Sequence, residues 1–142
     1  MARLSKGAAK LREQMNRTFP KRDTRSDGWL GDAAHAARKS DHNPDKDGIV
    51  HAIDLDADFG PPSKDYALRL ANDLVAYAKS GRKGSDRVKY VIFRGRIASA
   101  QRDWAWRKYT GSNPHTGHIH LSVTKASDAD GSSWPLPVFT KP

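Results

Sequence analysis

The chain has 142 residues, no cysteine and a formal net charge of +9, and this length suits one domain with one hydrophobic core. The lack of cysteine excludes disulfides, thiolate metal ligands and a cysteine nucleophile. Glutamate occurs only as Glu13, which excludes zinc-hydrolase motifs of the His-Glu-x-x-His type. Any general base must therefore be a histidine or an aspartate. The excess of basic residues favours a polyanionic partner, such as nucleic acid, an anionic membrane or a bacterial wall.

The sequence contains no candidate for a membrane span or a signal peptide. No stretch approaches the roughly 20 apolar residues that a membrane helix needs, and the opening MARLSKGAAKLREQ lacks the apolar middle of a signal peptide. We therefore expect a soluble chain that is made in the cytoplasm and does not associate with membranes. We also expect the protein to be a monomer.

The sequence pattern of the first half predicts two helices and a strand. Apolar residues at helical spacing predict an amphipathic helix over residues 3–16, and the turn-rich stretch 19–41 predicts a loop with one strand or helical turn. Residues 49–55 (IVHAIDL) predict a buried strand. Residues 63–79 predict a helix with Ser63 as its N-cap and Gly81 after its last turn.

The second half predicts strands. Residues 88–93 and 96–99 predict a hairpin around the turn Arg94-Gly95, and residues 118–123 alternate strictly between apolar and polar side chains. Residues 128–142 are rich in Pro, Gly and Ser, which is typical of a closing loop or the start of a linker. We expect one domain over residues 1–142.

The segment HTGHIH, residues 115–120, carries three of the six histidines. Because side chains two apart on a strand project the same way, His118 and His120 point away from the apolar face of the predicted strand. They could share one metal ion, or one could be a ligand while its neighbour serves the chemistry.

Further ligands are available between residues 40 and 56. A catalytic zinc takes three protein ligands and keeps one open position. His42 lies in a polar loop, and Asp54 is a carboxylate in an apolar strand, where an unpaired charge is costly. A metal ion would explain why Asp54 is tolerated. His51 is the weaker candidate because it falls on the opposite strand face.

Other interpretations of these residues stay open. A lone strand histidine or aspartate is commonly a hydrogen-bonded structural residue. Trp104, Trp106 and Tyr109 suit either the core or a substrate wall. The stretch 43–54 approaches an EF-hand loop that ends in Asp instead of Glu, which would make the chain a calcium-binding module. A basic nucleic-acid-binding protein, or a nuclease with His115 or His118 as base, is a further alternative.

Three short motifs resemble a group of zinc peptidases. Ser40-Asp41-His42 is similar to the group's Ser-x-His, Ala52-Ile53-Asp54 to its Ala-x-Asp, and His118-Ile119-His120 to its His-x-His. The group includes D-alanyl-D-alanine carboxypeptidases, the penicillin-insensitive murein endopeptidase, lysostaphin-type enzymes and the hedgehog signalling domain. From about residue 10 to about 137, runs such as SDGWLGDAAHAARKSDHNPDKDG and YTGSNPHTGHIHLSV resemble endolysin catalytic domains from phages of actinobacteria.

The resemblance implies zinc as cofactor, His42, Asp54 and His120 as its ligands, and an α+β fold with a small antiparallel sheet flanked by helices, like that of hedgehog and the DD-peptidases. It implies an endolysin that hydrolyses a stem or cross-bridge peptide of peptidoglycan. The bond would be L-alanyl to D-glutamate, D-alanyl to diaminopimelate, or D-alanyl to D-alanine. Such an enzyme would wait in the host cytoplasm until a holin-type pore releases it, and its partner would be the wall, not nucleic acid.

The sequence also departs from the group. His42 and Asp54 are twelve positions apart, where the group usually has seven, so Asp47 is a possible substitute ligand. The Glu-x-x-His motif of the carboxypeptidase branch, whose Glu serves there as general base, is absent. The general base would therefore be His118 or His115. Arg38 could hold a substrate carboxylate through its guanidinium group or be a surface arginine. Ser40, Trp106 and Tyr109 are the other expected substrate-binding residues.

Overall fold

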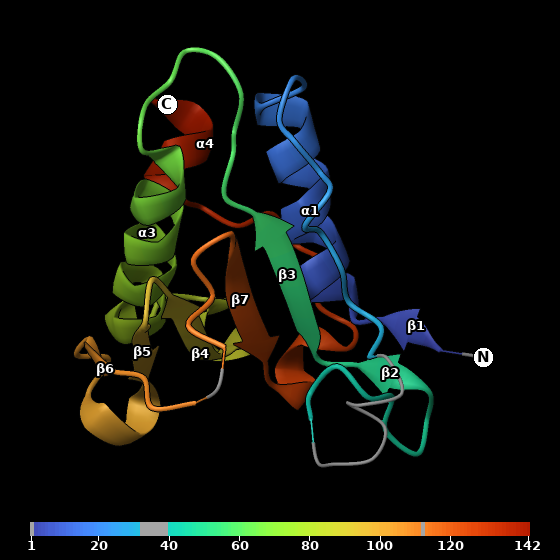
Figure 1. The fold of residues 1–142 in the computed structure, drawn as a ribbon. Coiled ribbons are helices and arrows are strands. Elements are labelled where there is room, and N and C mark those ends of the chain that lie inside the picture. The colour runs from blue at the N-terminus through green and yellow to red at the C-terminus, as the bar shows by residue number, and fades with distance from the viewer. Residues whose placement is uncertain (1, 32–39, 112) are drawn as a thin grey trace.

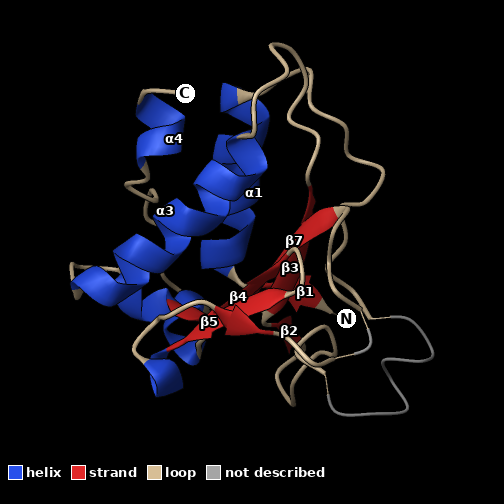
Figure 2. Cartoon of the chain, turned by 60° about the vertical axis from the view of Figure 1, so that its left-hand side comes forward, coloured by secondary structure: helices blue, strands red, loops and turns tan. Residues whose placement is uncertain are grey.

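The computed structural model describes residues 2–31, 40–111 and 113–142. In this part of the chain a five-stranded antiparallel sheet is combined with three α-helices, which lie on one side of the sheet (Figures 1 and 2). The strand order is β3 (Ala52–Asp56), β7 (His118–Val123), β4 (Val88–Phe93), β5 (Arg96–Ser99) and β6 (Arg107–Lys108). This arrangement is an α+β fold, as expected.

The first helix, α1 (Lys6–Thr18), begins later than predicted because the residues before it form a strand. β1 (Arg3–Leu4) pairs in parallel with β2 (Ile49–Val50). Ser5 is the N-cap, and its hydroxyl accepts a hydrogen bond from the Ala8 amide. The helix buries the face that contains Leu11 and Met15 against the sheet.

The predicted strand 49–55 consists of two strands that meet at His51. β2 pairs with β1, whereas β3 pairs with β7 in the five-stranded sheet. The single-strand prediction was wrong in this respect, because hydrophobicity along the chain does not reveal a change of pairing partner. β3 and β7 are neighbours, and their register sets Asp54 opposite His120.

The next described helix, α3 (Tyr66–Ser80), also begins later than expected. Asp65 is its N-cap and accepts from the Leu68 amide, so the prediction of Ser63 was wrong. Gly81 ends the helix in the left-handed conformation, as predicted. The predicted hairpin is confirmed as β4 and β5, and both Arg94 (φ 50°) and Gly95 (φ 72°) have positive φ in the turn.

The strand predicted over residues 118–123 is confirmed as β7. Ile119, Leu121 and Val123 are buried in the core against the helices. His118, His120 and Ser122 therefore project from the opposite face, which we call the histidine face of the sheet.

The last segment packs into the core. Trp134 and Leu136 are each 1% exposed, and Val138 in α4 (Pro137–Thr140) is fully buried. The Arg87 guanidinium carbon lies 3.9 Å from the centre of the Trp134 ring. Three short 3₁₀ segments, η1 (Ser85–Arg87), η2 (Ala100–Arg102) and η3 (Lys125–Ser127), complete the described elements. The segment that was predicted as a closing loop or linker start is thus part of the packed domain.

Within the described residues, no helix combines the length and the apolar character needed to cross a membrane.

Candidate metal centre

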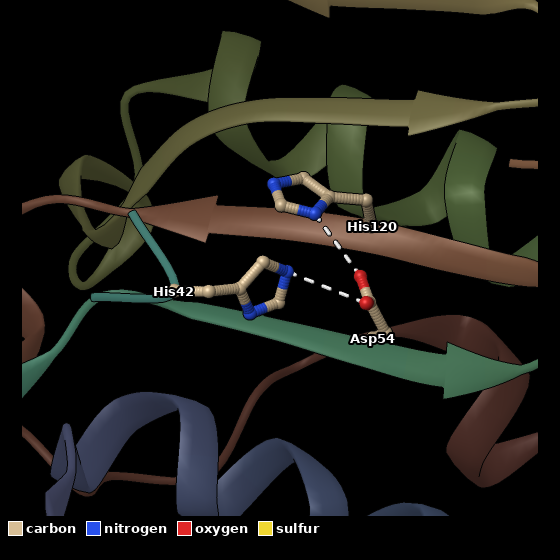
Figure 3. Close-up of side chains that lie close together, drawn as sticks. All are labelled: His42, Asp54 and His120. Carbon is tan, nitrogen blue, oxygen red and sulfur yellow. Dashed lines mark hydrogen bonds and ion pairs between the residues drawn. The ribbon is translucent and has the colours of Figure 1, made fainter. Parts of the chain in front are cut away.

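Asp54 and His120 meet across the β3–β7 pair. Asp54 Oδ1 lies 3.0 Å from His120 Nδ1, and the other ring nitrogen of His120 lies 2.8 Å from the Ser122 hydroxyl. Figure 3 shows the Asp54 carboxylate pointing towards the His120 and His42 rings from the edge of its strand. His120 is buried, and the Tyr90 ring stacks on it with centroids 5.5 Å apart.

His42 reaches the same carboxylate from the loop before β2. Its Nδ1 lies 2.9 Å from the Trp29 carbonyl oxygen, which can only accept, so Nδ1 carries the proton. Its Nε2 lies 3.3 Å from Asp54 Oδ2. The Trp29 carbonyl therefore orients the ring and directs Nε2 to Asp54, an arrangement that is usual for metal-binding histidines.

His115 and His118 form a second pair beside Asp54. His118 Nε2 lies 3.6 Å from Asp54 Oδ2, too far for a hydrogen bond, and the His115 and His118 ring centroids are 4.9 Å apart. His118 Nε2 and His115 Nδ1 are both buried without a hydrogen-bond partner among the described residues. Buried polar atoms in this state are rare in native proteins and indicate a missing partner.

The charges in the cluster are strongly coupled. Burial opposes ionisation of Asp54, but hydrogen bonds and positive charge from His120 and His42 outweigh it and hold the pKa of Asp54 well below its usual range. Burial lowers the pKa of His120. Burial, together with His120 and His118 nearby, lowers the pKa of His115 to about 4. For His42, burial is outweighed by the bond to Asp54, and its pKa is raised.

The cluster contains two groups of three that could hold a metal ion, and Asp54 belongs to both. One group is His42, Asp54 and His120, and the other is Asp54, His115 and His118. Within each group one donor atom per residue lies within 4.8 Å of the others. Two imidazoles and a carboxylate are a donor set that suits zinc and other divalent transition metals, so the residues fit a metal ion.

A third group, Asp45, His51 and Asp128, lies apart from this cluster. His51 Nε2 is 2.5 Å from Asp128 Oδ1, and its Nδ1 is 3.9 Å from Asp45 Oδ2. His51 is thus separate from Asp54, in line with its position on the opposite strand face. Asp128 carries no sequence signal, because it meets His51 only through the fold.

The carboxylates of the loop that resembles an EF-hand point in different directions. Asp45 Oδ1 accepts from the amides of Asp47 and Ile49, its other oxygen faces His51, and Asp54 faces the histidines. Among the described residues, Asp47 belongs to none of the possible metal groups. An EF-hand, whose ligands converge on one ion, is not the arrangement of this loop.

The expected substrate-binding residues lie in different places. Ser40 accepts a hydrogen bond from the His42 amide and shapes the ligand loop. The Tyr109 ring lies against His115, with centroids 5.8 Å apart. Trp106 packs against the hydrophobic core and donates to Asn72 on α3, away from the histidines. Arg38 lies outside the described residues.

Three contributors to the site were not among the predicted site residues. The alternation of residues 118–123 places Ser122 on the same face as His118 and His120, but no role was predicted for it. Tyr90 is brought to His120 by the pairing of β4 with β7. Trp29 contributes a backbone carbonyl, which any residue could supply, so its identity gave no signal.

Comparison with known proteins adds no relative. No protein-family model matches the sequence, and no curated protein or solved structure matches it. The arrangement of the residues is therefore the basis for the function proposed below.

Proposed function

We propose that this chain is a zinc-dependent peptidoglycan peptidase, the catalytic domain of a phage endolysin with a hedgehog/DD-peptidase-like fold. The observation that carries the proposal is the meeting of His42, Asp54 and His120, which come from a loop and two paired strands. These are the residues that match the ligand motifs of the zinc peptidases. The antiparallel sheet with helices on one face is compatible with that group.

His42, Asp54 and His120 would hold the zinc ion. When bound, zinc would supply Lewis-acid polarisation of the scissile carbonyl and lower the pKa of a coordinated water to about 7. The Trp29 carbonyl keeps His42 in the tautomer whose Nε2 faces Asp54. Ser122 engages the far nitrogen of His120, which leaves Nδ1 directed at Asp54.

His118 and His115 would carry the proton transfers. Each has a buried ring nitrogen that forms no hydrogen bond to the described residues, and His118 Nε2 lies close to Asp54. His118 would take the proton of the attacking water and return it to the departing amide nitrogen. His115 would donate a hydrogen bond to the oxygen on which negative charge develops.

The bacterial wall suits this chain electrostatically. A net charge of +9 attracts a polyanionic polymer and raises the encounter rate with it. We propose peptidoglycan as the partner, with action after release from the host cytoplasm and with the protein as a monomer. The bond that is cut would be one of the three candidate bonds in the wall peptide.

Purified bacterial walls test the function directly. The metal-loaded protein should release soluble fragments, and mass spectrometry of their new ends identifies the bond that is cut. A chelator should stop the release and added zinc should restore it. Cleavage of DNA with no release of wall fragments would contradict the proposal and favour the nuclease alternative.

Variants of the ligands test the site. His42→Ala and His120→Ala should lose both bound zinc and wall lysis. His51→Ala is the matched control, because it removes an imidazole from the separate group with Asp45 and Asp128, and it should keep both. A zinc-loaded, active His120→Ala protein would refute the ligand assignment.

A further inference from the structure

Unsatisfied polar atoms gather on the histidine face of the sheet. Within the described part of the chain, five buried side-chain polar atoms have no hydrogen-bond partner. One belongs to Arg87 in the core, and the other four are Ser99 Oγ, Arg107 Nε, His115 Nδ1 and His118 Nε2. Because such atoms are costly to leave unpaired, their concentration on one face indicates that a ligand with polar groups binds there.

The register of the sheet connects the histidines to Arg107. His120 pairs with Ile92, Ile92 pairs with Ile97, and Ile97 pairs with Arg107. Directly paired residues of an antiparallel sheet project to the same face. Arg107 therefore belongs to the histidine face, at the opposite edge of the sheet from Asp54. Ser99 is on the same face because it pairs with Tyr90, which in turn pairs with Ser122.

Burial agrees with this assignment. Ile92 is 3% exposed yet does not belong to the core cluster under the helices, as expected for a residue on the histidine face. Arg107 is partly buried, whereas the next residue, Lys108, is exposed and projects to the other face.

The distance along this row suits a peptide. Three strand spacings of about 4.8 Å separate the backbones of His120 and Arg107, or about 14 Å in all. The arginine side chain can shorten that gap, and an extended peptide rises about 3.3 Å per residue. A group bound by Arg107 would thus lie within about four residues of the hydrolysed bond.

Among the described residues, Arg107 has no anionic partner. Its guanidinium forms no hydrogen bond or ion pair with any described residue, whereas Arg94 at the neighbouring turn is paired with Asp65 at 2.7 Å. A partly buried charge is costly to leave unpaired, and a guanidinium can bind a carboxylate through two parallel hydrogen bonds.

We propose that Arg107, assisted by the Ser99 hydroxyl, is a specificity residue that binds a free carboxylate of the substrate peptide a few residues from the hydrolysed bond. The inference rests on the proposed peptidase function and names its substrate class. The preferred wall peptides carry an ionised carboxylate at this position, and peptides in which it is a primary amide are poor substrates.

The test compares two soluble wall peptides that differ only in whether this carboxylate is free or amidated. The wild-type protein should favour the free form by roughly tenfold to a hundredfold in kcat/KM, as expected for hydrogen bonds to a charged group. Arg107→Gln should lose this preference, mainly through a higher KM for the free form. Lys108→Gln removes the same charge from the other face and should keep the preference.

Different failures have different meanings. A wild-type protein that releases nothing from walls contradicts the proposed function. A wild-type protein that cuts both peptides equally well, or an Arg107→Gln protein that loses the same factor on both, overturns the role of Arg107 alone. Arg107→Lys, which keeps the charge but not the paired hydrogen bonds, should retain a smaller preference, with bound zinc unchanged. A Lys108→Gln protein that lacks the preference would also overturn the role of Arg107, because the preference would then depend on the overall charge and not on this residue.

Discussion

Asp54 and His120 occupy directly opposed positions in the β3–β7 pair, and their side chains are 3.0 Å apart. This relationship makes Asp54 the centre of the cluster, because His42 and His118 approach its other oxygen. Both possible metal groups within this cluster contain Asp54. Its carboxylate is therefore the group on which every assignment at this site depends.

Asp54→Asn tests that dependence. The amide has nearly the same size but no negative charge, so zinc affinity should fall at least about 100-fold, more than the loss of an outer-shell partner causes. Isothermal titration with zinc measures the change. Asp45→Asn, in the separate group, is the control and should bind zinc at the main site like the wild type. Unchanged affinity in Asp54→Asn would exclude this carboxylate as a ligand.

His118→Ala separates the two groups that share Asp54. If His42, Asp54 and His120 hold zinc, this variant keeps its metal but loses its base, and the hydrolysis rate falls about 100-fold or more. Metal analysis of the purified protein and single-turnover kinetics on wall peptides give the two readouts. Loss of zinc together with activity would instead assign the ion to Asp54, His115 and His118.

An ion pair between buried Arg22 and partly buried Asp27 supports the strand that carries Asp54. The Arg22 side chain is 2% exposed and binds both oxygens of Asp27, at 3.0 and 2.5 Å. Asp27 Oδ1 also accepts from the Asp56 amide at the end of β3. Gly28, the next residue, exchanges two backbone hydrogen bonds with Asp54. This pair therefore ties the segment before Trp29 to the strand that carries Asp54.

Asp27→Asn should destabilise the protein markedly, because it leaves the Arg22 guanidinium buried without a counter-charge. The loss of unfolding free energy should be about 3 kcal/mol, measured by urea denaturation. Asp23→Asn removes a carboxylate from the exposed pair with Arg25 and should change stability little. Equal effects of the two variants would contradict this role of the Arg22–Asp27 pair.

Trp134→Ala tests the role of the last segment. The ring is 1% exposed, lies against Arg87, and donates to the Gly7 carbonyl at 2.8 Å. Removing it should cost about 3–5 kcal/mol of unfolding free energy. Phe139→Ala, at a partly buried position of the same segment, should cost clearly less. A thermal or urea midpoint unchanged in Trp134→Ala would mean that residues 128–142 behave as a linker.

The local patterns of the sequence determined most of the elements. Strict alternation in residues 118–123 predicted β7 and the face on which its histidines lie, and apolar spacing with Gly81 predicted the body and the end of α3. These predictions succeed because side-chain direction in a strand or helix depends on neighbouring positions in the chain. The start of α3 was predicted wrongly, since Ser63 and Asp65 are both acceptable caps by residue type.

Pairing and contacts between distant segments were decided only by the tertiary structure. No local pattern shows that His51 ends one strand and precedes another, that Trp134 packs on Arg87, or that Asp128 meets His51. The sequence by itself supplied the residue types of a metal site and the alternation that points two histidines the same way. The register of β3 against β7 brings Asp54 to His120, and the Trp29 carbonyl orients His42 towards the same carboxylate. Only the tertiary structure decides these contacts, because strand pairing and backbone hydrogen bonds depend on the whole fold and not on the identity of single residues.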